Sequence, residues 1–250
     1  MTDPHLKIKI IATLSALITL TASPAYSDEG SSCEDVFSID IQVKKLKNCN
    51  QNRTFVRKGS ADQKSISLLE AMKNHNNVGA SVVKFRNKKK IVYRSANLAE
   101  APLCLQDVVR DGKVKTIIDL HSGTVGFEAE VRNLEASVFT RLGGETYIFI
   151  NDYMVDSPNY SASQMNTRIA SIIKLIASSD GNVLIHCLTG EHDTGVIFGV
   201  IQKCYNGIPI EQISKNLACH MAHMNSSHYA ISTYEIANNL IKNFSCDLLE

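Results

Sequence analysis

The stretch VLIHCLTGEHDTG, residues 183–195, decides the fold. It begins with three apolar residues that indicate a buried strand, continues through a cysteine and a short polar loop, and ends in Thr194-Gly195 at the expected start of a helix. Cys187 is therefore expected at the carboxyl end of a buried strand, where α/β folds place their ligand sites. The pattern predicts a functional loop over residues 187–195.

A loop of this kind is chemically suited to hold an anion. Backbone N–H groups at the start of a helix lack partners within the helix, and the helix dipole adds a partial positive charge there. Together they favour phosphate. The same field lowers the pKa of a thiol, which makes Cys187 a candidate nucleophile. Gly190 permits tight backbone curvature, and Thr194 can offer its hydroxyl to the thiolate.

Strands and helices alternate on both sides of this loop. The strands are expected at residues 80–85, 90–94, 114–120, 145–150 and 183–185. Helices are expected at residues 65–72, 98–110, 123–136, 164–177, 194–205, 210–224 and 234–243. The clearest helix, 164–177, carries its apolar side chains on one face: Met165, Ile169, Ile172, Ile173 and Ile176. The alternation predicts a three-layer α/β fold with a central, mostly parallel sheet flanked by helices.

Two segments precede the main domain, which we expect at residues 76–250. Residues 1–27 have the form of a signal peptide: a basic start at Lys7 and Lys9, an apolar run, and the small-x-small sequence Ala25-Tyr26-Ser27. The apolar run is too short to span a bilayer comfortably, so no stable membrane insertion is expected after cleavage. Residues 28–75 are polar and weakly patterned, which indicates a leader or a cap. The protein is therefore expected to be exported, to a periplasm or beyond it.

Charge and cysteine content narrow the partners further. Without the first 27 residues the formal net charge is zero, and no field favours nucleic acid or a membrane as a partner. An oxidising compartment favours disulfide bonds among the seven cysteines. If Cys187 is kept as a thiol, six remain, and the sequence cannot choose among their fifteen pairings. Cys33 with Cys49 is the pairing we favour, because both lie in a weakly patterned segment that needs a covalent link.

Residues 186–195 resemble the active-site signature of the cysteine-dependent protein tyrosine phosphatases, including their dual-specificity branch. That signature is His-Cys, five residues, Arg, then Ser or Thr, and often Gly. Here it reads His186-Cys187, residues 188–192, Asp193, then Thr194-Gly195, so every fixed position matches except the arginine. The segments YRSA (93–96), KTIIDL (115–120), GVIFGVIQKC (195–204) and PIEQI (209–213) also resemble segments of bacterial relatives, in the same order. The resemblance covers roughly residues 80–225 and implies a phosphatase-like fold.

The resemblance also implies a mechanism. In the family, the cysteine thiolate attacks phosphorus to form a phosphocysteine, and an aspartate on a separate loop protonates the leaving oxygen. These roles fall here to Cys187, with Thr194 beside it, and to an acid within NDYMVDSP (151–158), where Asp156 is favoured and Asp152 is the alternative. The substrate would lie against Leu188, Thr189, Gly190, Glu191, His192 and Asp193. The implied partner is a phosphorylated protein or a small phosphomonoester, with no cofactor and no metal.

Asp193 argues against efficient catalysis. Arginine at this position clamps two phosphate oxygens with its planar fork, and an ionised aspartate cannot donate those bonds. One charge pair at about 4 Å, with an effective dielectric near 20, is worth roughly 4 kcal/mol, so exchanging the sign changes the interaction by about 8 kcal/mol before screening. Glu191 adds a second acid, and both acids should raise the pKa of Cys187.

Cations elsewhere could compensate for these acids: His192 when protonated, Arg94, Arg141 or Lys203. Two hypotheses for the function therefore remain. One is an exported tyrosine or dual-specificity phosphatase with weak or absent turnover, and the other is an inactive relative that binds a protein partner or a phosphorylated ligand.

A second cluster of possible ligands lies near the end of the chain. Cys219, His220, His223 and His228 could hold zinc, since two of these histidines are three residues apart on an expected helix. Their spacing fits no strong zinc pattern, so the predicted functional site contains no metal.

Overall fold

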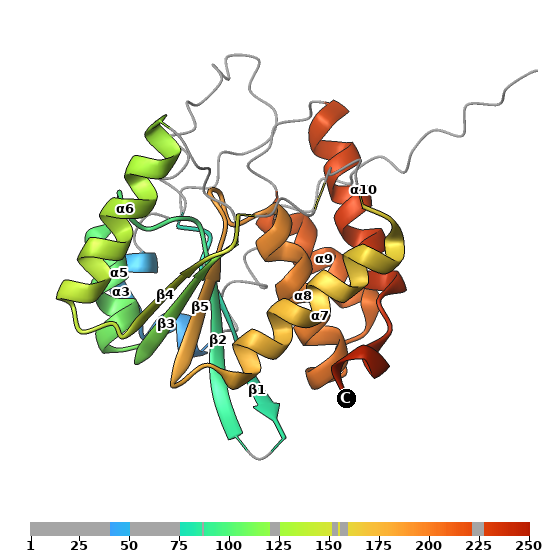
Figure 1. Ribbon diagram of the computed structural model, residues 1–250, viewed down its shortest axis with the longest axis horizontal. Helices are drawn as coiled ribbons and strands as arrows, with labels where there is room; N and C mark the ends of the chain where they lie inside the picture. The colour runs from blue at the N-terminus through green and yellow to red at the C-terminus, as the bar shows by residue number, and fades with distance from the viewer. Residues whose placement is uncertain are drawn as a thin grey trace, which may run out of the picture.

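The computed structural model describes residues 41–50, 76–86, 88–120, 126–151, 155, 160–221 and 228–250. A sheet of five strands in the order β1-β2-β5-β3-β4 forms its centre (Figure 1). The strands are β1 (Gly79–Phe85), β2 (Lys88–Ser95), β3 (Val114–Asp119), β4 (Thr146–Phe149) and β5 (Asn182–His186). Only β1 runs antiparallel to its neighbour, and every other pair is parallel. The predicted, mostly parallel sheet is confirmed.

Helices cover both faces of this sheet. They are α2 (Ile41–Lys44), α3 (Lys47–Asn50), α5 (Pro102–Arg110), α6 (Gly126–Arg141), α7 (Ala162–Ser178), α8 (His192–Asn206), α9 (Ile210–His220) and α10 (His228–Asn243), followed by the 3-10 turn η1 (Cys246–Leu249). Figure 1 shows α3, α5 and α6 on one side of the sheet and α7 to α10 on the other. The three-layer α/β architecture predicted from the alternation is therefore correct.

Strand β5 is the centre of the molecule. It pairs with β2 on one side and β3 on the other, and Val183, Leu184 and Ile185 are completely buried. Val183 and Ile185 face the apolar cluster under α7 and α8, whereas Leu184 faces the cluster under α5, as the alternation of side chains along a strand requires. His186 pairs with the last residues of both neighbouring strands, Ser95 and Asp119. The residue after it, Cys187, therefore lies in the middle of the carboxyl edge of the sheet.

Several helix boundaries differ from those predicted. Helix α5 begins at Pro102 rather than at residue 98, because the residue before a proline avoids the helical conformation and proline suits the first helical turn. Helix α8 begins at His192, two residues early, so that Asp193 lies in its first turn. Helix α9 ends at His220 and α10 begins at His228, where the prediction had 224 and 234. The helix predicted at 65–72 lies outside the described residues.

Two lysine side chains cap the C-termini of helices other than their own. Lys90 of β2 is buried and donates from Nζ to the carbonyls of Ile176, Ala177 and Ser179 at the end of α7. Lys203 of α8 donates in the same way to the carbonyls of Ile241, Lys242 and Phe244, at and just beyond the end of α10. A cation at a helix C-terminus satisfies unpaired carbonyls and the dipole.

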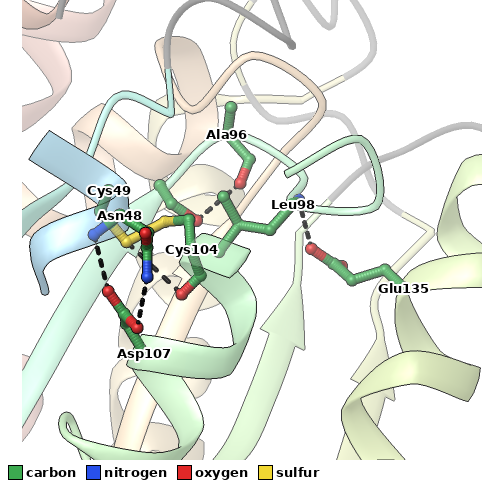
Figure 2. The surroundings of a disulfide bond; sticks show 8 residues. Asn48, Cys49, Ala96, Leu98, Cys104, Asp107 and Glu135 are labelled. Carbon is green, nitrogen blue, oxygen red and sulfur yellow. Dashed lines mark hydrogen bonds between the residues drawn. A yellow bond between two sulfur atoms is a disulfide. The ribbon is translucent and has the colours of Figure 1, made fainter. Parts of the chain in front are cut away.

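The disulfide bonds correct one prediction. Cys49 pairs with Cys104 of α5, so the predicted Cys33–Cys49 bond is wrong (Figure 2). The reason is that residues 41–50 dock on α5: Val43 and Leu46 are buried, and the Asn48 amide groups bond to the Asp107 carboxylate at 2.7 and 2.9 Å. Cys33 itself lies outside the described residues.

A second disulfide joins Cys204 of α8 to Cys246 of η1, and Cys219 is also disulfide-bonded. Cys187 is the free thiol of the described part of the chain. Among the helices that the structure describes, none has both the length and the apolar content needed to cross a bilayer.

Candidate active site

The loop after β5 curves tightly around the sulfur of Cys187. Gly190 has φ +73°, a conformation that other residues rarely adopt, and a Cβ added there would lie 2.3 Å from the Ser95 carbonyl oxygen. The backbone N–H groups of Gly190 and Thr194 and the Thr194 hydroxyl lie near the sulfur and act to lower the pKa of Cys187. The loop therefore has the form of a cradle whose donors point inwards, which is the arrangement that binds an oxyanion.

The outward side of the same loop is held by hydrogen bonds to three consecutive carbonyls. The donors are Asn97 N–H (3.1 Å to Leu188), Asn77 Nδ2 (3.1 Å to Thr189) and an Arg94 guanidinium N–H (to Gly190). Because a trans peptide points its C=O and N–H in opposite directions, the amides of residues 189–191 face the other side, away from these anchors. Asn77 lies just before β1, Arg94 lies in β2, and Asn97 follows β2. The ends of these two strands therefore help to hold the loop in its curved shape.

We expect Gly190→Ala to open this cradle. The substitution adds a strained φ and a collision with the backbone of Ser95. Gly207→Ala is the matched control, because Gly207 has φ +64° and nothing within 4 Å of its added Cβ. The control should lose about 1 kcal/mol of unfolding free energy, and Gly190→Ala at least about twice as much. Chemical denaturation measures both, and equal losses would mean that the close approach to Ser95 has no energetic consequence.

The thiol of Cys187 is poorly activated. Its residue is only 5% exposed, and burial together with the charge of Asp193 raises its pKa, although the Thr194 hydroxyl and the amides of Thr194 and Gly190 act in the opposite direction. A raised pKa means that the neutral thiol predominates at neutral pH. The donors of a nucleophilic site are therefore present, but the nucleophilic species is scarce.

Asp193 lies in the first turn of α8 and is completely buried. Its Oδ1 accepts a hydrogen bond of 2.9 Å from the backbone N–H of Val155. Val155 belongs to the segment 151–158, where the sequence predicts the catalytic acid. Asp156 and Asp152 themselves lie outside the described residues. Asp193 thus joins the first turn of α8 to this segment, and its charge acts to raise the pKa of Cys187.

Of the cations proposed to compensate for the acids, Arg94 contacts the loop. It is 2% exposed, and its Cζ lies 5.5 Å from the ring centroid of Phe198. Burial lowers its pKa to about 10, while Cys187 and Glu191 act to raise it, so the guanidinium is charged at neutral pH. Lys203 is committed to the end of α10, and Arg141 is an exposed residue at the end of α6.

The remaining loop residues predicted to bind substrate divide into two groups. Leu188, Thr189 and His192 are partly exposed. Gly190 and Glu191 are buried, and burial raises the pKa of Glu191 well above its usual value, although Arg94 acts to lower it. Of these loop residues, Leu188, Thr189 and His192 are therefore the ones that solvent reaches.

A buried ionic network behind His186 escaped the sequence analysis. His186 Nε2 lies 2.8 Å from Glu135 Oε2, and the Tyr147 hydroxyl donates to the same oxygen at 2.8 Å. The Leu98 N–H donates to Glu135 Oε1 (Figure 2). Burial disfavours the charge on His186, but Glu135 and Asp119 outweigh it and raise the pKa of His186 to about 9. Glu135 lies on α6 outside any motif, so no sequence signal distinguished it from the exposed acids of that helix.

The hypothetical zinc cluster is not assembled in the part of the chain described. Cys219 is in a disulfide, which removes it as a thiolate ligand, and His220 Nδ1 is 2.7 Å from Asn77 Oδ1. No group of three or more His, Cys, Asp or Glu side chains among these residues could hold a metal ion. His223 lies outside the described residues.

Comparison with known protein families shows which family contains the segment around the Cys187 loop. The family model described as "Tyrosine phosphatase family" matches residues 69–235, about two thirds of the chain and all of the sheet. The chain belongs to the tyrosine phosphatase family. Residues 186–195, which resemble the active-site signature of that family, lie within the matched range.

Several solved structures are distantly similar to this phosphatase-family chain. The catalytic domain of the PP-IP phosphatase Siw14 from S. cerevisiae, in complex with citrate, is 18% identical over 68% of this chain and 86% of its own, with a TM-score of 0.46. P. aeruginosa TpbA in complex with phosphotyrosine is 16% identical over 68% and 93% of the two chains, with a TM-score of 0.44. No curated protein matches significantly.

Proposed function

We propose that this tyrosine phosphatase family member is an exported protein in which hydrolysis of phosphomonoesters is absent or very weak, and that it acts by binding a protein partner. The observation that carries the proposal is the fully buried carboxylate of Asp193 in the first turn of α8, beside the sulfur of Cys187. Export is inferred from the sequence of residues 1–27, and the disulfide bonds are in keeping with it.

The chemistry of cysteine-dependent hydrolysis explains why Asp193 is decisive. The thiolate must attack phosphorus while positive charge neutralises the equatorial oxygens, because phosphoryl transfer depends almost entirely on positioning and electrostatics. A phosphate dianion approaching Cys187 would instead meet a largely neutral thiol and a carboxylate. Burial keeps the thiol largely neutral, and Asp193 adds to this effect while supplying no clamp.

A phosphatase with slow turnover is the second candidate, and the cradle itself favours it. The amides of Gly190 and Thr194 and the hydroxyl of Thr194 still face the sulfur, and Arg94 brings a buried cation to the loop. Such an enzyme would form a cysteinyl-phosphate on Cys187, with Asp156 as the predicted acid for the leaving oxygen. Its substrates would be phosphorylated proteins or small phosphomonoesters, as the family implies.

Hydrolysis of p-nitrophenyl phosphate separates the two candidates. We expect the purified protein to be no more active than its Cys187→Ser variant, because the raised pKa of the thiol and the charge of Asp193 act together. Cys187-dependent turnover in the ordinary enzymatic range, about 1 s⁻¹ or faster, would overturn the first proposal and establish the second. The Cys187→Ser protein also corrects for any contaminating phosphatase.

A further inference from the structure

Two buried side chains with ionisable groups, Arg94 and Glu191, belong to the cradle and to the strand beside it. Arg94 comes from β2 and Glu191 from the loop itself, and each residue is 2% exposed. Neither the Nε of Arg94 nor the Oε2 of Glu191 makes a hydrogen bond to the part of the chain that the structure describes. Burying the guanidinium of Arg94 without satisfying its Nε is costly, which points to a role for Arg94 in the loop that it contacts.

The contact that Arg94 makes is with the backbone of the cradle. Its guanidinium donates to the Gly190 carbonyl, which is the third of the three outward-pointing carbonyls of the loop. The other two are held by neutral amides, of Asn97 and Asn77. Of the three donors, only the one bonded to the Gly190 carbonyl is charged. Charge-assisted hydrogen bonds are about twice as strong as neutral ones.

We propose that Arg94 is the positioning residue of the Cys187 loop: by holding the Gly190 carbonyl from behind, it keeps the inward amides on the sulfur and the cradle closed. The arginine that the family signature places inside the loop is absent, and Arg94 supplies a fixed cation from the neighbouring strand. This inference concerns the same site as the proposed function but requires neither phosphate binding nor turnover.

The groups that surround the sulfur come from three elements. Asp193 and the Thr194 amide belong to the start of α8, the Gly190 amide belongs to the loop, and Arg94 belongs to β2. His186 on β5 is directed to Glu135 on the other side of the sheet. The reactivity of Cys187 therefore reports on the position of the loop, provided that the thiol pKa and the accessibility of the thiolate are measured separately.

The test is the rate of Cys187 alkylation by iodoacetamide as a function of pH. The midpoint of the profile gives the thiol pKa, and the plateau at high pH gives the accessibility of the thiolate. In Arg94→Gln, which removes the cation and shortens the donor, we expect the plateau to rise at least about tenfold, corresponding to about 1.4 kcal/mol of loop-opening free energy. Arg94→Lys keeps the charge but not the planar fork, and its plateau should lie between those of the wild-type protein and Arg94→Gln.

Lys90→Gln is the matched control. Lys90 is on the same strand, is also buried, and also donates to backbone carbonyls, but it serves the end of α7. It lies four residues from Arg94, about 13 Å along an extended strand. We expect this variant to lose thermal stability while the alkylation profile of Cys187 stays within about twofold of wild type, since distant sites act independently.

Two results would overturn the inference. One is an unchanged plateau in folded Arg94→Gln, and the other is an equal rise in Lys90→Gln, which would mean that general destabilisation exposes the thiol. If circular dichroism finds Arg94→Gln unfolded, Arg94→Lys decides alone: a plateau equal to that of the wild type overturns the proposal, and a raised plateau without a similar rise in Lys90→Gln supports it. None of these outcomes depends on whether the protein hydrolyses phosphate.

Discussion

Asp193→Arg should turn this protein into a measurable phosphatase, with Cys187-dependent hydrolysis of p-nitrophenyl phosphate at least about a hundredfold above the wild-type background. The substitution removes a negative charge beside the sulfur and supplies the bidentate clamp. The unscreened difference is about 8 kcal/mol, so the expected gain requires only about a third of it to survive screening and relaxation. The amides and the hydroxyl that complete the cradle are already in place around Cys187.

Asp193→Asn is the control that separates the two effects of this change. Its side-chain oxygen can still accept the Val155 N–H, so the contact with the segment 151–158 is preserved while the charge is lost. We expect it to lower the pKa of Cys187 but to recover only a small part of the turnover, because asparagine supplies no cation. If Asp193→Arg is no more active than Asp193→Asn, the absence of the clamp is not what limits the reaction. Adding Cys187→Ser to Asp193→Arg must abolish the gain.

Glu135→Gln should destabilise the fold by about 3 to 5 kcal/mol at neutral pH, because removing one partner of a buried ion pair leaves the other charge uncompensated. Glu135 contacts His186 and accepts from Tyr147 and from the Leu98 N–H, so it joins α6 to three other parts of the sheet's edge. Urea denaturation gives the change in unfolding free energy. Glu130→Gln, an exposed acid on the same helix, should change it by less than about 0.5 kcal/mol.

The pH dependence of this effect has a defined sign. The pKa of His186 is raised to about 9 in the folded protein, from about 6.5 in an unfolded chain. Its stabilising contribution is therefore complete below about pH 6.5 and is lost as the pH rises through about 9. The difference between wild type and Glu135→Gln should shrink over this interval. A difference that stays constant to about pH 10 would mean that Glu135 acts through its neutral contacts rather than through the charge of His186.

The sequence was informative wherever a pattern repeats along the chain. Apolar periodicity gave the strands, the helix over Ala162–Ser178 with its buried isoleucines, and the central position of β5, because each of these depends on burial of a regular set of side chains. The family followed from the order of short segments around His186-Cys187. These features need no knowledge of which residues meet across the fold.

Features that depend on long-range contacts could not be predicted in this way. The pairing of Cys49 with Cys104 follows from the docking of residues 41–50 on α5, which leaves no periodic signal. Glu135 looks like any helical acid until its helix is placed beside His186. Arg94 was one of several candidate cations, and only the direction of its side chain separates it from Lys203.

The most direct test of the account is the affinity of the cradle for a phosphate mimic, measured by calorimetry with tungstate. One carboxylate, that of Asp193, is expected to make this oxyanion site reject dianions. The wild-type protein should then bind tungstate more weakly than about 1 mM, and Asp193→Arg should bind it at least about a hundredfold more tightly, a difference of about 2.7 kcal/mol. Micromolar binding of tungstate by the wild-type protein, unchanged in Asp193→Arg, would contradict it.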